Sequence, residues 1–165
     1  MTKSMEDLQA AFAGESQANR KYLAFAEKAD QEGYPQVARL FRAAAAAETV
    51  HAHSHLRAMS GISSTAENLK AAVAGENFEA TQMYPGFLKD AEADKDQKAV
   101  RSFTYALEAE KIHEEMYKAA LESLEKKGEE YDYYICPVCG FTHARNAPDK
   151  CPICGALGTK FSRVS

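Results

Sequence analysis

The chain has 165 residues, enough for one ordinary domain with a small appendage, and 45% of them are hydrophobic, which excludes a disordered chain. The net charge of −4 argues against nucleic acid as the main partner, because phosphate binding needs clustered Lys and Arg. No apolar run reaches the roughly 18 to 20 residues that a membrane helix needs, and no signal peptide is recognisable, so we expect a cytoplasmic protein without a membrane partner.

The first 128 or so residues are rich in helix-forming side chains and predict four helices. The expected helices span residues 4–32, 35–59, 65–93 and 96–127. Pro35 suits the first turn of the second helix, and Ser64 followed by Glu67 is typical of a capping box at the start of the third. Pro85 falls inside the third helix, where we expect a kink or a break.

The composition changes after Gly128. The tyrosine-rich segment 131–135 predicts a short strand, and Pro and Gly interrupt the residues that follow. A segment of this length builds little core and usually needs a metal or disulfides in order to fold. We therefore expect a helical domain at residues 1–130 and a small, metal-stabilised domain at residues 131–165.

The helical part contains an internal repeat. Ala13–Glu15 recurs as Ala74–Glu76, and the pair Glu48-x-x-His51 recurs as Glu110-x-x-His113. Two helical hairpins of this kind can pack with approximate two-fold symmetry.

Four glutamates interrupt apolar stripes near the middle of the expected helices, namely Glu15, Glu48, Glu76 and Glu110. A buried, unpaired carboxylate is unfavourable, and the stripes contain no Lys or Arg, so a bound metal is the simplest explanation. One ExxH pair alone is usually an ordinary surface pair. Two of them together with a Glu from each of the other two helices match the pattern of two-metal carboxylate bundles. Oxygen-rich ligation with one imidazole for each metal suits iron or manganese.

All four cysteines lie in two CxxCG turns, Cys136–Cys139 and Cys151–Cys154. Two close pairs in a chain that looks cytosolic favour a metal site over disulfides. Four thiolates give a tetrahedral site that fits both iron and zinc.

These motifs resemble those of the rubrerythrins over essentially the whole chain. The matching segments are GESQA at 14–18, ETVH at 48–51, GENFEATQMYPGF at 75–87, EAEKIH at 108–113, and the CPVCG and CPICG turns. The resemblance implies a mainly α protein: a ferritin-like four-helix bundle followed by a rubredoxin-like module with short β-strands. It also implies a peroxidase that reduces hydrogen peroxide to water in defence against oxidative stress.

The resemblance further assigns ligands to two non-haem irons. Glu48 and Glu110 would bridge the two irons. Glu15 would bind one iron at its outer side, and Glu76 with His113 would bind the other.

The iron held by Glu15 is implied to take His51 when reduced and Glu79 when oxidised. The charges favour this exchange, because four glutamates neutralise two ferrous ions and a fifth carboxylate balances part of the charge that oxidation adds. Tyr22 and Tyr84 match tyrosines close to the two-iron site of the family. Our catalytic candidates are therefore His51, Glu79, Tyr22 and Tyr84.

The resemblance also assigns a rubredoxin-type iron, which passes single electrons, to Cys136, Cys139, Cys151 and Cys154; zinc is a conceivable substitute. The implied electron source is NAD(P)H, through a separate reductase or rubredoxin. Members of the family form dimers in which the cysteine site of one subunit approaches the two-iron site of the other, and some exchange helices. We therefore expect a homodimer or a higher oligomer.

Two other functions fit parts of the sequence. A ferritin-like protein that oxidises and handles iron would use the same bundle, but storage does not need the cysteine module. A binding protein with a structural zinc ribbon would use the cysteines, and it would lack the red colour of four-thiolate ferric iron.

Overall fold

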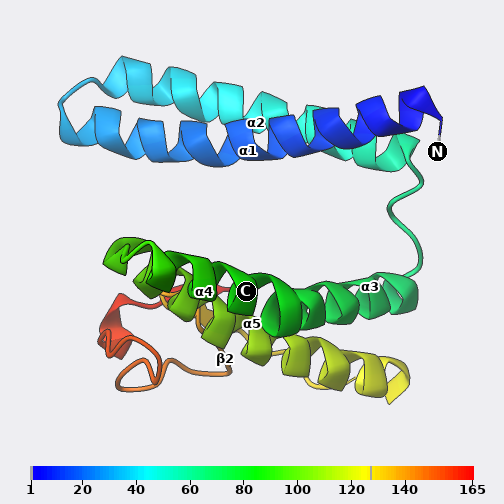
Figure 1. The fold of residues 1–165 in the computed structure, drawn as a ribbon, viewed down its shortest axis with the longest axis vertical. Coiled ribbons are helices and arrows are strands. Elements are labelled where there is room, and N and C mark those ends of the chain that lie inside the picture. Colours follow the sequence, from blue (N-terminus) through cyan, green and yellow to red (C-terminus); the bar gives the residue numbers. More distant parts are fainter. Residues whose placement is uncertain (1, 127) are drawn as a thin grey trace. The chain divides into compact units, whose positions relative to one another are not determined.

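The computed structural model describes residues 2–126 and 128–165 and confirms the mainly helical fold (Figure 1). Its contacts divide the chain into two compact units, Met1–Ser63 and Ser64–Ser165, each of which is described by itself. The domain boundary expected at residue 130 stays a prediction. Among the described residues, no helix combines the length and the apolar character needed to cross a membrane.

The first unit is a hairpin of two long helices, α1 (Lys3–Gln31) and α2 (Pro35–Ala58), which lie side by side along their length (Figure 1). Gly33 adopts a positive φ of 80° between them, a conformation that glycine reaches without steric cost. Buried alanines, including Ala26 and Ala38, line the contact and let the two backbones approach closely.

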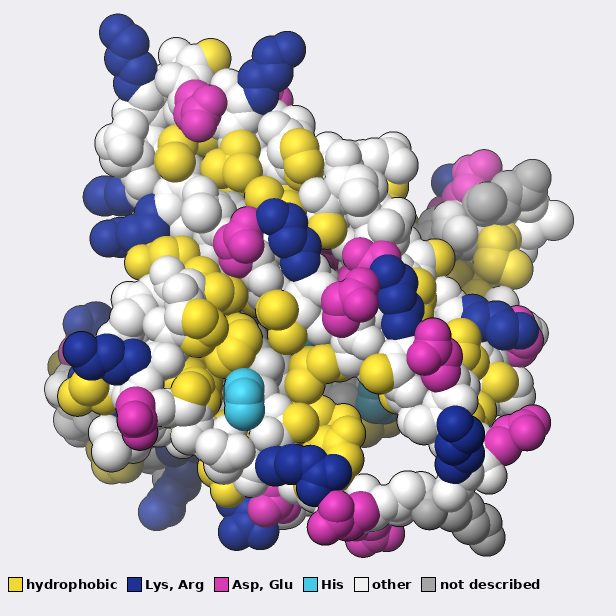
Figure 2. All heavy atoms as spheres, turned by 90° about the horizontal axis from the view of Figure 1, so that it is seen from below, with side chains coloured by type: hydrophobic (Ala, Val, Ile, Leu, Met, Phe, Trp, Pro, Cys, Tyr) yellow, Lys and Arg dark blue, Asp and Glu magenta, His cyan; other side chains and the backbone are white. Residues whose placement is uncertain are grey.

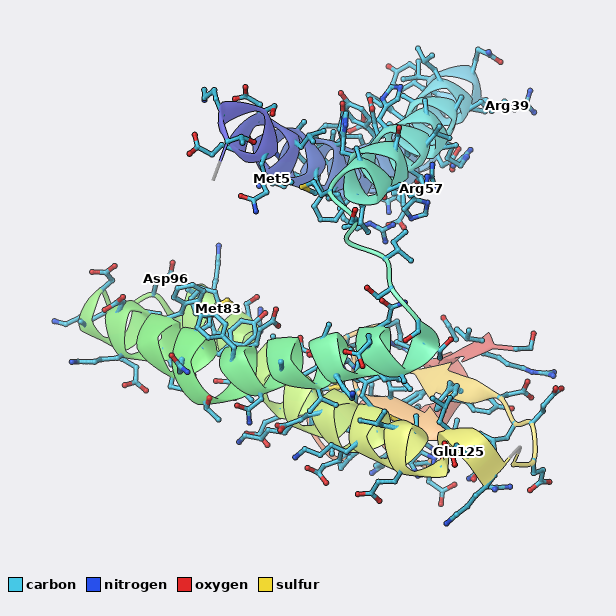
Figure 3. All side chains as sticks on the ribbon, turned by 90° about the vertical axis from the view of Figure 1, so that its right-hand side faces the viewer. Met5, Arg39, Arg57, Met83, Asp96 and Glu125 are labelled. Atoms are coloured by element: carbon cyan, nitrogen blue, oxygen red, sulfur yellow. The ribbon has the colours of Figure 1, made fainter. Side chains whose placement is uncertain are left out.

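The second unit begins with a helical hairpin that is interrupted on one arm. Its elements are α3 (Thr65–Phe78), the π-helical segment η1 (Glu79–Met83), α4 (Tyr84–Ala93) and α5 (Gln97–Ser123). The Ser64 hydroxyl accepts a hydrogen bond from the backbone N–H of Glu67, as the capping pattern predicts. The Asp96 carboxylate likewise accepts hydrogen bonds from the backbone N–H groups of Lys98 and Ala99 at the start of α5. In Figure 3, Asp96 marks this start, and Glu125 lies just beyond the other end of the helix.

The predicted interruption near Pro85 is present, and it takes the form of the π-helical segment η1, which ends two residues before Pro85. Pro85 has no N–H with which to continue the ordinary α-helical ladder. The N–H of Tyr84 instead bonds to the carbonyl of Glu79, five residues earlier. Short π segments inside α-helices occur frequently at functional sites, and here the segment starts at Glu79.

The chain then makes a 3₁₀ turn, η2 (Leu124–Lys126), and enters a small module that we call the cysteine module, residues 131–165. Its three antiparallel strands follow the order β2-β1-β3. They are β1 (Tyr133–Ile135), β2 (Thr142–Ala144) and β3 (Ser162–Val164), with a 3₁₀ turn η3 (Gly158–Lys160) before the last. The short strand predicted in segment 131–135 is thereby confirmed.

The cysteine module packs against α5 of its own unit. A buried cluster contains three of the cysteines and Phe141, and Tyr105 and Ile112 of α5 pack against it. Cys136 is the largest side chain among the described residues that is fully buried, so the core of this module is built around its thiols.

Both helical hairpins leave large apolar side chains uncovered within the chain. Leu40 is 67% exposed and Val50 is 62% exposed, whereas the buried hydrophobic residues of the helices are alanines. Figure 2 shows hydrophobic side chains exposed among Lys, Arg, Asp and Glu on the face that it presents. Extended apolar surface of this kind marks an interaction site.

Candidate metal centres

The first unit brings Glu15 of α1 together with Glu48 and His51 of α2, and we call this group the first triad. One ligand atom from each side chain lies within 4.8 Å of the others. The His51 Nδ1 atom is 2.9 Å from Glu48 Oε2 and 3.7 Å from Glu15 Oε1. A hydrogen bond between the two carboxyl groups raises the pKa of Glu15 and lowers that of Glu48. The two carboxyl groups therefore share one proton, which Glu15 holds more tightly than Glu48.

The second unit repeats this arrangement with Glu76 of α3 and with Glu110 and His113 of α5, the second triad. The His113 Nδ1 atom is 2.7 Å from Glu110 Oε2. Partial burial, followed by the charge of Glu110, raises the pKa of Glu76 to about 7. The hydrogen bond from His113 lowers the pKa of Glu110. The internal repeat in the sequence is thus a repeat of one carboxylate–histidine group.

The carboxylates of both triads lack a permanent positive partner. Among the described residues, their only ion-pair partners are His51 and His113, and none is Lys or Arg. Clustered carboxylates without a cation repel one another, and the group becomes favourable when a metal supplies the positive charge. Carboxylate oxygens with one imidazole nitrogen for each metal form a donor set that suits iron.

Glu79 and Tyr84 lie close to the second triad. Burial, followed by the charge of Glu110, raises the pKa of Glu79. Burial also raises the pKa of Tyr84, and the charge of Glu79 adds to the effect. These two catalytic candidates therefore belong to the second unit, whereas His51 belongs to the first. The exchange of His51 for Glu79 at one metal stays a prediction.

Tyr22 lies in an aromatic cluster of the first unit. Its ring centroid is 6.3 Å from that of Phe25 and 6.1 Å from that of Phe41. Its catalytic role stays a prediction. His143, which the sequence analysis did not include among the ligands, is held by a hydrogen bond to the Asn146 carbonyl oxygen at 2.7 Å.

The four cysteines converge on one point as free thiols. The sulfur atoms of Cys136 and Cys154 are 3.5 Å apart, and those of Cys139 and Cys151 are 3.4 Å apart. Burial acts to raise the pKa of the Cys151 thiol, but the backbone N–H groups of Cys154 and Ile153 outweigh it and lower this pKa to about 7. A thiol that ionises readily is prepared to bind a metal.

The two CxxCG turns have the same backbone geometry. Gly140 and Gly155 adopt φ angles of +79° and +77°. Their N–H groups bond to the carbonyl oxygens of Cys136 and Cys151, both at 3.0 Å. The positive φ explains the glycine that follows each second cysteine, because other residues rarely adopt it.

The structure also shows one site residue that the sequence analysis missed. The hydroxyl of Thr142 in β2 lies 2.9 Å from Nε2 of His113 in α5. The two residues are 29 positions apart in the chain, so no helical or strand spacing in the sequence indicates this contact. It joins the cysteine module to a ligand of the second triad within one chain. The approach of a cysteine site to the two-iron site of another subunit stays a prediction.

Comparisons with known proteins cover both parts of the chain. The family model described as Rubrerythrin matches residues 6–121, and the one described as the rubredoxin-like domain of rubrerythrin matches residues 134–162. Rubrerythrin-2 of Clostridium acetobutylicum is 39% identical, and the match covers 93% of this chain and 92% of that protein. Nigerythrin of Nitratidesulfovibrio vulgaris is 37% identical, with 92% and 81% covered.

Solved structures of nigerythrin resemble the whole chain. Those of the mixed-valence and the fully reduced, all-ferrous states are 35% identical to this chain, with TM-scores of 0.60 and 0.61. Each match covers 99% of this chain and 88% of the other. The ferritin-like and rubredoxin-like architecture, the carboxylate site for two irons and the four-cysteine site are thereby confirmed.

Replacing Glu76 by Gln should have opposite effects on the metal-free and the metal-loaded protein. The folded carboxyl has a pKa of about 7, above its usual 4.5, so the metal-free fold loses stability as the pH rises through this range. Glu76→Gln should therefore raise the free energy of unfolding of the metal-free protein at pH 8 by about 1 kcal/mol, a value reduced for solvent screening. With metal bound, the same change should lower stability.

Urea unfolding at pH 4 and pH 8, with and without metal, measures both effects. Glu67→Gln is the matched control, because Glu67 is exposed on the same helix and pairs with Lys70. Loss of stability at pH 8 in the metal-free Glu76→Gln variant would contradict the prediction.

Removing the metal from the four cysteines should unfold the cysteine module and leave the α1–α2 hairpin folded. The buried cluster of this module consists of three cysteines and Phe141, so little else stabilises it. Hydrogen exchange measured by mass spectrometry should show loss of protection confined to residues from about 131 onwards and to the face of α5 that contacts them. Protection that persists after chelation, with no metal detected, would show that the module folds without one.

Proposed function

Because the chain belongs to the rubrerythrin family, we propose that it is a non-haem di-iron peroxidase that reduces hydrogen peroxide to water. The members of this family are generally oxidoreductases. One observation carries the proposal: two carboxylate–histidine triads without Lys or Arg partners occur in the same chain as a four-thiol site. The first kind of site suits a two-electron reaction, and the second suits the supply of single electrons by a reductase or a rubredoxin.

The roles of the triad residues follow from their contacts. When bound, the two irons supply the electrons that break the O–O bond, and the cysteine iron replaces them one at a time. Glu48 and Glu110 would hold the irons together with the histidines of their own ExxH pairs, which lie 2.9 Å and 2.7 Å away. Glu15 and Glu76, from the other helix of each hairpin, would each supply a further carboxylate.

Reduction of one peroxide to two waters consumes two electrons and two protons, so the site also needs proton donors. Glu79 has a raised pKa and therefore holds its carboxyl proton closer to neutral pH than an ordinary glutamate does. The Tyr84 hydroxyl lies near the same carboxylates. We assign proton delivery to these two groups. Glu79 also supplies the fifth carboxylate in the exchange with His51.

We further propose that two copies of the chain exchange helical hairpins. A ferritin-like bundle contains one long connection that runs the length of a helix. α2 has 24 residues and is about 36 Å long. The connection from Ala58 to Thr65 has seven Cα–Cα steps and reaches at most about 25 Å. A hairpin from a second chain completes the bundle without this crossover, and it would cover the exposed apolar side chains.

Anaerobic reduction followed by rapid mixing with peroxide tests the peroxidase activity. Peroxide should reoxidise the two-iron site with one equivalent per site, and oxidation of the cysteine iron should follow. Glu79→Gln should slow the first phase about 10²-fold, the usual effect of losing one proton donor. Glu67→Gln should react like the unmodified protein.

Failure of peroxide to reoxidise the two-iron site would exclude the peroxidase function. Unchanged kinetics in Glu79→Gln would exclude only the role assigned to that residue.

Complementation between two defective variants tests the hairpin exchange. Glu48→Gln damages the first triad, and Glu110→Gln damages the second. In exchanged dimers, coexpression of the two variants gives one intact site in each mixed dimer, or about a quarter of all sites. Stopped-flow amplitude measures this fraction. If each chain forms its own bundle, every site contains one damaged triad and no activity returns.

A further inference from the structure

His113 is held at both of its ring nitrogens. Its Nδ1 atom lies 2.7 Å from Glu110 Oε2, inside the second triad. Its Nε2 atom lies 2.9 Å from the hydroxyl of Thr142, at the start of β2 in the cysteine module. The second contact joins the second triad to the cysteine module, and the His113 ring also has a hydrogen bond to the backbone of Gly140 in that module.

The direction of these hydrogen bonds determines the tautomer of His113. The Thr142 hydroxyl donates to the carbonyl oxygen of Gly140 at 3.2 Å. Its oxygen is then free to accept a hydrogen bond from Nε2–H of His113. In the metal-free chain Nδ1 also carries a proton, which it donates to Glu110 Oε2. When a metal replaces this proton, Nδ1 offers its lone pair on the side where Glu76 and Glu110 provide their oxygens. This is the arrangement that a metal-binding histidine requires.

The fold of the cysteine module determines the position of Thr142. Gly140 follows Cys139 directly, and a Cβ atom on Gly140 would lie only 3.9 Å from the Ala109 side chain of α5. Phe141 is buried beside the cysteines and packs in the cluster that contacts α5. Thr142 is therefore placed by two neighbours that hold the module against the helix of His113.

His51, the counterpart of His113, lacks this support. Its side chain is 55% exposed, compared with 26% for His113. Within its own unit, the hydrogen-bond and ion-pair partners of its ring among the described residues are Glu48 and Glu15, both reached through Nδ1. The internal repeat therefore gives two similar triads, and within its own unit the second has its histidine held from outside the triad as well.

We propose that Thr142 is a positioning residue that fixes His113 at its metal and thereby makes the two metal positions unequal. Within its own unit, the His113 ring is held at both nitrogens, whereas the described partners of the His51 ring are all at Nδ1. Since the folded cysteine module supplies the Thr142 hydroxyl, metal binding at the four cysteines should also strengthen metal binding at the second triad. This coupling is reciprocal by thermodynamic necessity. The inference rests on the proposed function only in that both triads bind metal.

Thr142→Val removes the hydroxyl and keeps the shape of the side chain. The affinity of ferrous iron is measured anaerobically by chelator competition on the full chain, with zinc already bound at the four cysteines. In a His51→Ala background, which isolates the His113 position, Thr142→Val should weaken binding 10- to 100-fold, the usual cost of losing such a partner. In a His113→Ala background, the change should have no effect.

Two controls separate positioning from packing. Thr142→Ser keeps a hydroxyl and should restore the affinity to within about threefold. Thr104→Val removes a hydroxyl on α5 that bonds only to the carbonyl of Val100, and it should have no effect. One zinc retained for each chain shows that the cysteine module of a variant is folded.

Unchanged affinity in Thr142→Val, equal loss in both backgrounds, or no rescue by Ser would each overturn the inference. If the unmodified chain binds no iron at either triad, the proposed function itself fails. The two failures are therefore distinguishable.

Discussion

Electrostatic repulsion between carboxylates is the constraint on which this structure depends. Each hairpin brings two glutamates into one small group, and among the described residues the ion-pair partner of these carboxylates is a histidine and not Lys or Arg. Without metal, one carboxyl group of each triad takes up a proton more readily than usual: the hydrogen bond to Glu48 raises the pKa of Glu15, and burial followed by the charge of Glu110 raises that of Glu76. With metal, the same groups become ligands. The carboxylates that repel one another in the metal-free chain are therefore the groups that a bound cation would stabilise.

The two triads are similar in sequence but unequal in their surroundings. The second lies beside the π-helical segment that begins at Glu79, and it contacts the cysteine module through Thr142. Within its own unit, the first triad has neither feature among the described residues. In our proposal, the cysteine module has a second role, since Thr142 would position a metal ligand in addition to the electron transfer proposed for the four cysteines.

Much of the site could be predicted from the sequence because its signals are local. Glu48 with His51 and Glu110 with His113 are one helical turn apart, and the CxxCG turns define a metal site within a few residues. The break near Pro85 followed from the chemistry of proline, but its π-helical form at Glu79 depends on how the whole helix accommodates the missing N–H. The Thr142 contact could not be predicted, because it depends on the docking of two elements that are distant in the chain.

The stoichiometry of iron binding tests most directly the claim that metal resolves the carboxylate repulsion. An anaerobic titration of the metal-free chain with ferrous iron, followed by Mössbauer spectroscopy, counts the bound ions and distinguishes thiolate from carboxylate ligation. We expect about three irons per chain, one at the four cysteines and two at the triads, which form three groups of donors. A chain that binds one thiolate-ligated iron and leaves the triads empty would contradict this expectation.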